Sequence, residues 1–380
     1  MVIKEFFTKS IGLTKIGFTN AVDIAIAAIF WLYLATILSS ESYGEISYFI
    51  AIAALTSVIS FLGSGNTLMV YIPKGIKLQS TIYFVAIIIG LVAAIVVFVI
   101  FQNIAISIFI IGQVIFSLVI HEMLGKKEYN DYAKYVISQR IISVVLAIVL
   151  YYEIGLNGII FGLAFAFLPY SIKLYKVFKY SKIEMRILKK YFVFMINSYG
   201  FDLSKVFPTY ADKLLIYPLL GFALLGNYQL GIQSLLVLSI LPYTVFQFTL
   251  PRESSGISNK KLKIITVLIS IILSSLVIFL APIVFPVVFP QFNQAIEVVQ
   301  IMSLAIVPIS ISFMYSSEFL AGEKSKFVLI GSAIFVFLQI LLIVLLAKSH
   351  GVNGAAIAFI IGASSEAIFF AIVKKFIPQK

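Results

Sequence analysis

The sequence contains no cysteine, which excludes disulfide bonds, thiolate metal ligands and redox-active cysteine pairs. Histidine is nearly absent too, and the two residues present, His121 and His350, form no H-x-x-x-H or similar cluster. The P-loop motif G-x-x-x-x-G-K-[ST] does not occur, so we expect no direct hydrolysis of ATP. No pair of carboxylates accompanies a nucleophile in a predicted outer loop. We therefore predict no catalytic residue, no metal site and no cofactor.

Charged residues are also scarce. They make up 12% of the 380 residues, about half the share found in soluble globular proteins, whereas 61% of the residues are hydrophobic. Apolar stretches of about 17–25 residues, the length that crosses a bilayer as a helix, recur along the whole chain. We predict an all-α integral membrane protein with about twelve transmembrane helices. The predicted spans are 17–38, 43–64, 80–101, 104–121, 137–153, 156–177, 192–217, 220–249, 263–284, 297–319, 327–347 and 352–373.

The few charges are unequal in sign, with 28 Lys and Arg against 16 Asp and Glu. If the N-terminus is cytoplasmic, nearly all of the cations fall in cytoplasmic loops, and this bias sets the orientation of membrane proteins. We predict a multi-pass protein of the plasma (inner) membrane with both termini cytoplasmic. The net charge of +12 is explained by this orientation and by attraction to anionic membrane lipids, so we expect no nucleic-acid partner. The basic segment 182–194, KIEMRILKKYFVF, is expected to lie in the headgroup region.

Two short patterns recur between the halves of the chain. The pattern G-[hydrophobic]-N-G occurs at 155–158 and at 351–354, each just before the last predicted helix of its half. A weaker pair places Gly44 opposite Gly226, 182 residues later. Parallel repeats of this kind occur in transporters that rock one half against the other. We predict two parallel-repeat six-helix bundles, an N-terminal one at 1–182 and a C-terminal one at 183–380.

Charges interrupt the apolar sequence at 201–213, FDLSKVFPTYADK. A spacing of 4, 3, 4 and 3 puts five polar residues on one helical face. These are Ser198, Asp202, Lys205, Thr209 and Asp212. With the 182-residue offset, Asn20 and Asp23 fall at the corresponding place in the first half. A charge at the bilayer centre costs at least ~2.5–3.5 kcal/mol, so we expect this stripe to face a hydrated cavity between the two halves.

A purely structural interpretation of the same charges is also open. Asp202 and Lys205 are three residues apart, so they could form an ion pair that stabilises their helix, with Asp23 pairing Lys205 from the first helix. We expect Asp212 and Lys213 to lie at the outer membrane interface, because the predicted helix ends there.

Three stretches resemble a known family. The first is LATILSSESYGEISYFIAIAALTSVISFLGSGN (34–66), with a polar turn before Tyr-Gly and a closing Leu-Gly. The second is YADKLLIYPLLGFALLGNYQLGIQSLLVLSILPYTVFQFTLPR (210–252), with an Asp before an apolar run, then Leu-Gly-x-Tyr and late prolines. The third is GVNGAAIAFIIG (351–362). They are similar to the polysaccharide and O-antigen flippases of the multidrug/oligosaccharidyl-lipid/polysaccharide (MOP) exporter superfamily.

The resemblance implies two six-helix bundles arranged as a V. It also implies transport of isoprenoid-diphosphate-linked oligosaccharide from the cytoplasmic to the outer leaflet by alternating access. The chain departs from that family because Lys205 is its one clearly intramembrane cation, where several are common. Arg140 and Arg252, expected at the cytoplasmic ends of their helices, would serve the entrance.

The resulting hypothesis is a membrane flippase, not an enzyme. Lys205 attracts the diphosphate, Asn20 and Thr209 hydrogen-bond the sugars, and a coupling H⁺ or Na⁺ binds Asp23 or Asp202. The predicted substrate-binding residues are Lys205, Asn20, Thr209, Gln247, Arg252 and Arg140. The expected partners are a lipid-linked oligosaccharide, membrane lipids and glycan-assembly proteins. Three alternatives stay open: a cation antiporter of the same superfamily, a membrane-embedded glycan-assembly enzyme, and a scaffold that transports nothing.

Overall fold

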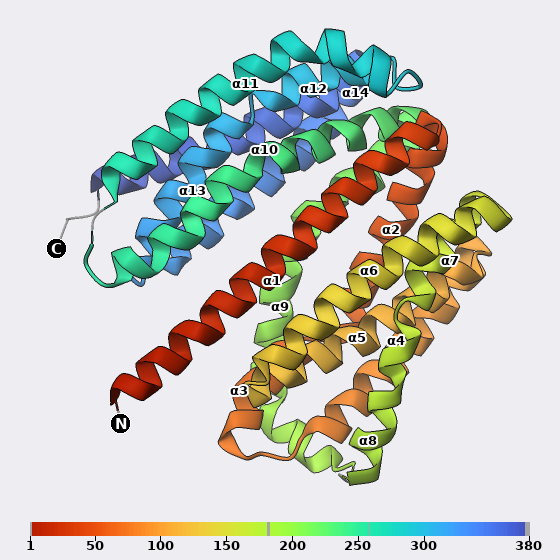
Figure 1. The fold of residues 1–380 in the computed structure, drawn as a ribbon, viewed down its shortest axis with the longest axis vertical. Helices are drawn as coiled ribbons and strands as arrows, with labels where there is room; N and C mark the ends of the chain where they lie inside the picture. Colours follow the sequence, from red (N-terminus) through yellow and green to blue (C-terminus); the bar gives the residue numbers. More distant parts are fainter. Residues whose placement is uncertain (1, 181–182, 258, 377–380) are drawn as a thin grey trace. The chain divides into compact units, whose positions relative to one another are not determined.

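The structure is a computed structural model that describes residues 2–180, 183–257 and 259–376, and these residues contain helices but no strand (Figure 1). The helices of the first half are α1 (Val2–Ile37), α2 (Ser40–Phe61), α3 (Ser64–Tyr71), η1 (Ile72–Lys74), α4 (Gln79–Phe101), α5 (Ile104–Lys126), α6 (Tyr129–Ile154), α7 (Leu156–Phe165), η2 (Leu168–Ser171) and α8 (Ile172–Tyr180). Those that follow are α9 (Met185–Leu220), α10 (Phe222–Ser254), α11 (Lys260–Val288), α12 (Ala295–Ser303), α13 (Ile306–Ala321) and α14 (Ser325–Phe376).

Ten helical segments of this described part are long and apolar enough to cross a membrane, which confirms the all-α membrane fold. One of them, α14, is 52 residues long and covers two predicted spans. Its backbone bends between these spans at Gly351, where φ is 56°. Only glycine adopts this left-handed conformation without a steric cost, so Gly351 of the repeated G-x-N-G pattern marks the break. The 36-residue α9 contains the charged stretch 201–213 and is not among the ten.

Several helix ends differ from the predicted ones because hydropathy does not detect polar helical turns. Most of the basic segment 182–194 forms the first turns of α9, which starts at Met185, and its position in the headgroup region stays a prediction. The short helix α3 was not predicted. Most important for function, α6 starts at Tyr129, eight residues before the predicted 137. Arg140 therefore lies about three turns inside α6, and the expectation that it sits at the helix end is wrong.

The chain divides into two compact units, each built from two segments. Unit 1 comprises residues 1–30 and 49–210, and unit 2 comprises residues 31–48 and 211–380. Both α1 and α9 are shared between the units, and their dividing points, after Phe30 and after Tyr210, are separated by nearly the repeat offset. The assignment of bundles to 1–182 and 183–380 stays a prediction.

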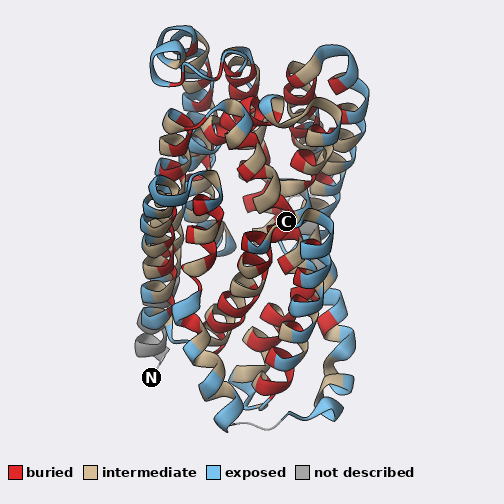
Figure 2. Cartoon of the chain, turned by 90° about the vertical axis from the view of Figure 1, so that its right-hand side faces the viewer, coloured by how far each residue is buried: buried red, intermediate tan, exposed pale blue. Residues whose placement is uncertain are grey.

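Inside each unit, buried and exposed positions alternate along the helices (Figure 2). In unit 2 the repeat-related Gly44 and Gly226 place the backbones of α2 and α10 in direct contact. A Cβ added at Gly44 would overlap the carbonyl oxygen of Phe222 and lie 2.7 Å from the nitrogen of Gly226, and one at Gly226 would overlap the carbonyl oxygen of Ser40. Only glycines permit so close an approach of two helices.

Candidate functional site

Within unit 1, the part of α1 that contacts α6 is bridged to it by polar side chains. Lys15 Nζ donates to Asn130 Oδ1 (2.7 Å), and Tyr132 OH donates to Asn20 Oδ1 (2.9 Å). One turn further along α1, Asp23 binds Arg140. Residues three or four apart on a helix share a face, so the sequence spacing itself aligns these groups along one side of α1 and one side of α6.

The contact between Asp23 and Arg140 is bidentate. Arg140 Nε lies 2.6 Å from Asp23 Oδ1, and an η nitrogen of the same guanidinium lies 3.0 Å from Asp23 Oδ2. The two side chains are 23% and 31% exposed, so both are half-buried. A planar guanidinium matches a carboxylate in this two-point geometry, which is among the strongest polar contacts in proteins. The structure thus gives Asp23 a partner, Arg140, that the sequence analysis did not consider.

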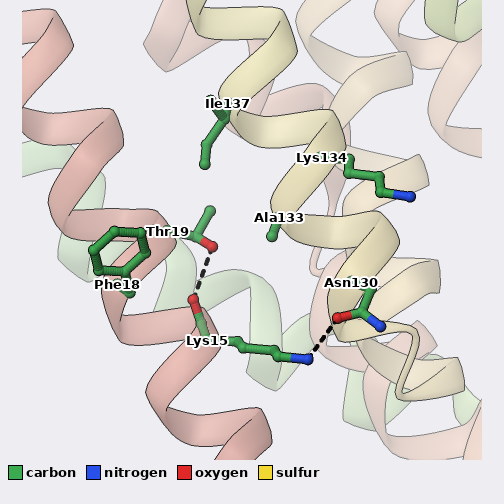
Figure 3. A pocket seen from close by; sticks show the side chains of 7 residues that line it. All are labelled: Lys15, Phe18, Thr19, Asn130, Ala133, Lys134 and Ile137. Carbon is green, nitrogen blue, oxygen red and sulfur yellow. Dashed lines mark hydrogen bonds between the residues drawn. The ribbon is translucent and has the colours of Figure 1, made fainter.

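Next to these bridges, α1 and α6 enclose a cavity of about 520 Å³ (Figure 3). Thr19, Ala133 and Ile137 point into the space between the two helices in the close-up view. Its lining residues are Lys15, Phe18, Thr19, Asn130, Ala133, Lys134 and Ile137. The ionisable groups among these lining residues are two lysines. The lysines lie at its border, since Lys15 reaches Asn130 and the side chain of Lys134 extends away from α1 in the close-up view. The cavity thus combines positive charge at its border with hydroxyl, amide and apolar groups, a chemistry suited to an anionic amphiphile.

The remaining predicted residues of unit 1 lie on α9. Asp202 accepts a hydrogen bond from Asn66 Nδ2 of α3 (2.9 Å), which links α9 to α3. Thr209 is exposed. The side chain of Lys205 lies outside the described part of the structure. Of the predicted site residues, the structure thus brings Asn20, Asp23 and Arg140 to a single pair of helices.

Two predicted residues belong to unit 2, on α10. Gln247 is half-buried, and the exposed guanidinium of Arg252 lies 4.9 Å from the ring centroid of Phe248. The expected position of Asp212 and Lys213 at the outer membrane interface stays a prediction, but the structure shows that both side chains are buried within unit 2. Asp212 is 3% exposed and accepts a hydrogen bond from Tyr228 OH (3.0 Å), and Lys213 is 5% exposed.

Sequence reasoning missed Lys15, Asn130, Tyr132 and Lys134. All four lie outside the predicted apolar spans 17–38 and 137–153, which begin too late. A signal was nevertheless present, because Asn130, Lys134, Ile137 and Arg140 follow one another at helical spacing, as do Lys15, Thr19 and Asp23.

No protein-family profile and no curated protein matches the sequence. Solved structures do match. The lipid II flippase MurJ in an inward closed conformation is 13% identical, with 95% of this chain and 87% of that chain covered and a TM-score of 0.75. An inward-facing multidrug resistance transporter of the MATE family is 15% identical, with 94% of each chain covered and a TM-score of 0.65. A MOP superfamily transporter from Pyrococcus furiosus, described as having a binding pocket of reverse polarity that suggests a different function, is 12% identical, with coverages of 96% and 95% and a TM-score of 0.58.

At these identities the likeness establishes the fold and nothing finer. The neighbours are flippases and transporters of one superfamily, and each is matched over nearly its whole length. The protein is a multi-pass helical membrane protein whose fold is similar to that of these MOP superfamily transporters.

Proposed function

We propose that the protein is a flippase that moves an isoprenoid-diphosphate-linked oligosaccharide from the cytoplasmic to the outer leaflet of the plasma membrane by alternating access. The observation that carries this proposal is the charge of the cavity between α1 and α6, whose ionisable lining residues are Lys15 and Lys134. A lipid diphosphate carries several negative charges beside an apolar chain. Lysine side chains are common phosphate ligands. A cationic drug would meet repulsion at the same place.

The hydrogen-bonding groups of the cavity suit the headgroup. Thr19 and Asn130 line the cavity beside the two lysines, and Asn20 lies next to Thr19 on α1. Hydroxyl and amide groups bind sugar hydroxyls without adding charge. We propose that Asn20 and Thr209 contact the sugars and that Lys205 contacts the diphosphate. Gln247 and Arg252 would contact the substrate later, as it crosses the membrane.

We propose that the ion pair of Asp23 and Arg140 couples substrate transport to the movement of H⁺ or Na⁺. Arg140 is held by a carboxylate in this structure, and a diphosphate is a stronger ligand for a guanidinium because it carries more charge. We propose that the substrate takes Arg140 from Asp23. The freed carboxylate then lies in a membrane without its counter-charge, which favours uptake of H⁺ or Na⁺. Asp202, bound by Asn66, is the second candidate for this role.

The test is leaflet transfer of an isoprenoid-diphosphate oligosaccharide in sealed proteoliposomes. The double variant Lys15→Ala/Lys134→Ala is expected to reduce transfer at least tenfold. The matched control Lys77→Ala/Lys189→Ala removes two exposed lysines of unit 1 that do not line the cavity, and it is expected to transport normally. Equal transfer by both double variants would remove the cavity from the proposal.

A cation antiporter is the principal rival, because MATE transporters are among the structural neighbours. That function needs a carboxylate in the binding cavity, yet the ionisable residues that line the cavity between α1 and α6 are Lys15 and Lys134. The same vesicles test the rival directly, since exchange of a cationic dye without transfer of lipid-linked sugar would replace the flippase by an antiporter. Sugar transfer by detergent-solubilised protein would instead indicate a glycan-assembly enzyme.

A further inference from the structure

A second cavity, of about 950 Å³, lies in unit 2, apart from the site proposed above. It is enclosed by the end of α10, the first turns of α11, the end of α13 and the last turn of α14. Four lysines and two glutamates line it: Lys260, Lys263, Lys324, Lys374, Glu253 and Glu318. So many ionisable groups around one cavity at the end of a helical bundle need an explanation.

Four of these groups neutralise one another. Lys263, which is buried, has its Nζ 2.5 Å from Glu253 Oε1 and 3.1 Å from Glu318 Oε1, and it also donates to the carbonyl oxygen of Met314 (2.9 Å). Lys374 Nζ lies 2.5 Å from the other oxygen of Glu318. The two carboxylates therefore have their counter-charges within the wall of the cavity, and neither is available to another cation.

The other two lysines, Lys260 and Lys324, are not part of this ion-pair cluster. Among the described residues, neither Lys260 nor Lys324 has an ion-pair partner, and both line the cavity. Lys260 is also the first residue of α11, where the unpaired backbone N–H groups and the helix dipole add positive potential. The cavity thus has an excess of two positive charges that the protein itself does not neutralise, so its complement is an anion.

The wall next to the lysines is apolar and exposed. Ile264 and Leu268 of α11 line the cavity and are 52% and 54% exposed. They start an apolar face of a helix that is among the most hydrophobic in the chain and long enough to span a membrane. Exposed aliphatic side chains on such a helix are covered by acyl chains. A ligand that matches both parts has a phosphate at one end and hydrocarbon at the other.

We propose that this cavity binds an anionic phospholipid, with its phosphate between Lys260 and Lys324 and an acyl chain along Ile264 and Leu268. Basic pockets between transmembrane helices are known to hold lipid headgroups of this class. The four-group cluster around Lys263 lines the same cavity and adds no net charge to it. The lipid is a component of the folded protein in the membrane and is distinct from the transported substrate.

The experiment measures lipid retained by the full-length protein in detergent, using native mass spectrometry with added phosphatidylglycerol or phosphatidylcholine. The wild type is expected to retain one phosphatidylglycerol in preference to phosphatidylcholine. Each lysine near an anionic headgroup contributes about a fivefold gain in affinity, so Lys260→Ala/Lys324→Ala should bind about 25-fold more weakly. The control Lys261→Ala/Lys326→Ala removes the same charge from neighbouring exposed positions that do not line the cavity and should bind normally.

Four results would overturn the proposal. They are equal weakening in the control, unchanged binding in the cavity variant, equal retention of phosphatidylcholine, and displacement of the lipid by millimolar inorganic phosphate that binds alone. The last result would assign the site to a soluble phosphate. Lys260→Arg/Lys324→Arg keeps the charge and should bind as the wild type does, so a cavity variant that fails to fold does not end the test. Loss of lipid binding with normal sugar transfer would leave the proposed function intact.

Discussion

Breaking the ion pair of Asp23 and Arg140 should lower the unfolding free energy of unit 1, by an amount that depends on how far the two side chains are exposed. Asp23→Asn leaves the guanidinium of Arg140 without its carboxylate, and Arg140→Gln leaves the carboxylate without its guanidinium. At the centre of a bilayer an unpaired charge costs about 2.5–3.5 kcal/mol. Because the side chains of Asp23 and Arg140 are 23% and 31% exposed, water reaches them and lowers this figure. We expect each single variant to lose about 1–2 kcal/mol of unfolding free energy.

The double variant Asp23→Asn/Arg140→Gln removes both charges and should recover most of this loss. The coupling energy of the cycle is then about 1–2 kcal/mol, well above the few tenths of a kcal/mol found for independent sites. The measurement is denaturant unfolding in one detergent for the wild type and the three variants. Asp23→Asn combined with Lys77→Ala is the control, because Lys77 has no contact with Asp23, and its effects should add. Additive effects in the main cycle would refute the conclusion that Asp23 and Arg140 form one functional pair.

Three further predictions concern packing, buried charge and orientation. Gly226→Ala should lower the unfolding free energy by about 1–3 kcal/mol, because the added Cβ would overlap the carbonyl oxygen of Ser40. Gly200→Ala on α9 should raise it by about 0.5–1 kcal/mol, because a Cβ there meets nothing within 4 Å. Thermal unfolding compares the two variants, and equal effects would contradict the close contact of α2 and α10. Lys263→Met should cost about 3–5 kcal/mol, because it leaves Glu253 without its ion pair, whereas Glu318 keeps Lys374. Lys263→Met/Glu253→Gln should recover part of this loss in the same assay, and no recovery would show that the lysine acts through packing. Because the chain has no cysteine, a single cysteine can be introduced by Lys77→Cys or by Lys324→Cys and labelled with a thiol reagent. Both cysteines should react from the cytoplasmic side of the membrane, and reaction of either from outside intact cells would reverse the predicted orientation.

The fold was predictable from the sequence because membrane insertion depends mainly on the length and hydropathy of each stretch. The apolar runs locate nearly every spanning helix, and the repeated glycines mark positions with a structural consequence. Gly44 and Gly226 contact each other, and Gly351 bends α14. A hydropathy profile does not predict which polar turns extend a helix, so the start of α6 at Tyr129 and the position of Arg140 could not be placed.

The candidate site was predictable only in part, since spacing gives the face of a helix and not its neighbour. Asn20 and Asp23 were identified as polar positions in the first helix, but Arg140 was not identified as the partner of Asp23. The identity of that partner depends on which helix packs against α1, a tertiary fact that local sequence does not contain. Likewise, the sequence does not show that Asp212 is buried and accepts a hydrogen bond from Tyr228 of α10, because that contact too depends on which helix packs against α9.

The most direct test of the proposed flippase is transfer of an isoprenoid-diphosphate oligosaccharide between the leaflets of sealed proteoliposomes, with and without an imposed H⁺ or Na⁺ gradient. We expect transfer by the wild type, a loss of at least tenfold in Lys15→Ala/Lys134→Ala, and normal transfer in Lys77→Ala/Lys189→Ala. We also expect that Asp23→Asn removes the response to the gradient. If the wild type moved no lipid-linked sugar and instead exchanged cationic dyes across the same vesicles, the flippase proposal would be contradicted.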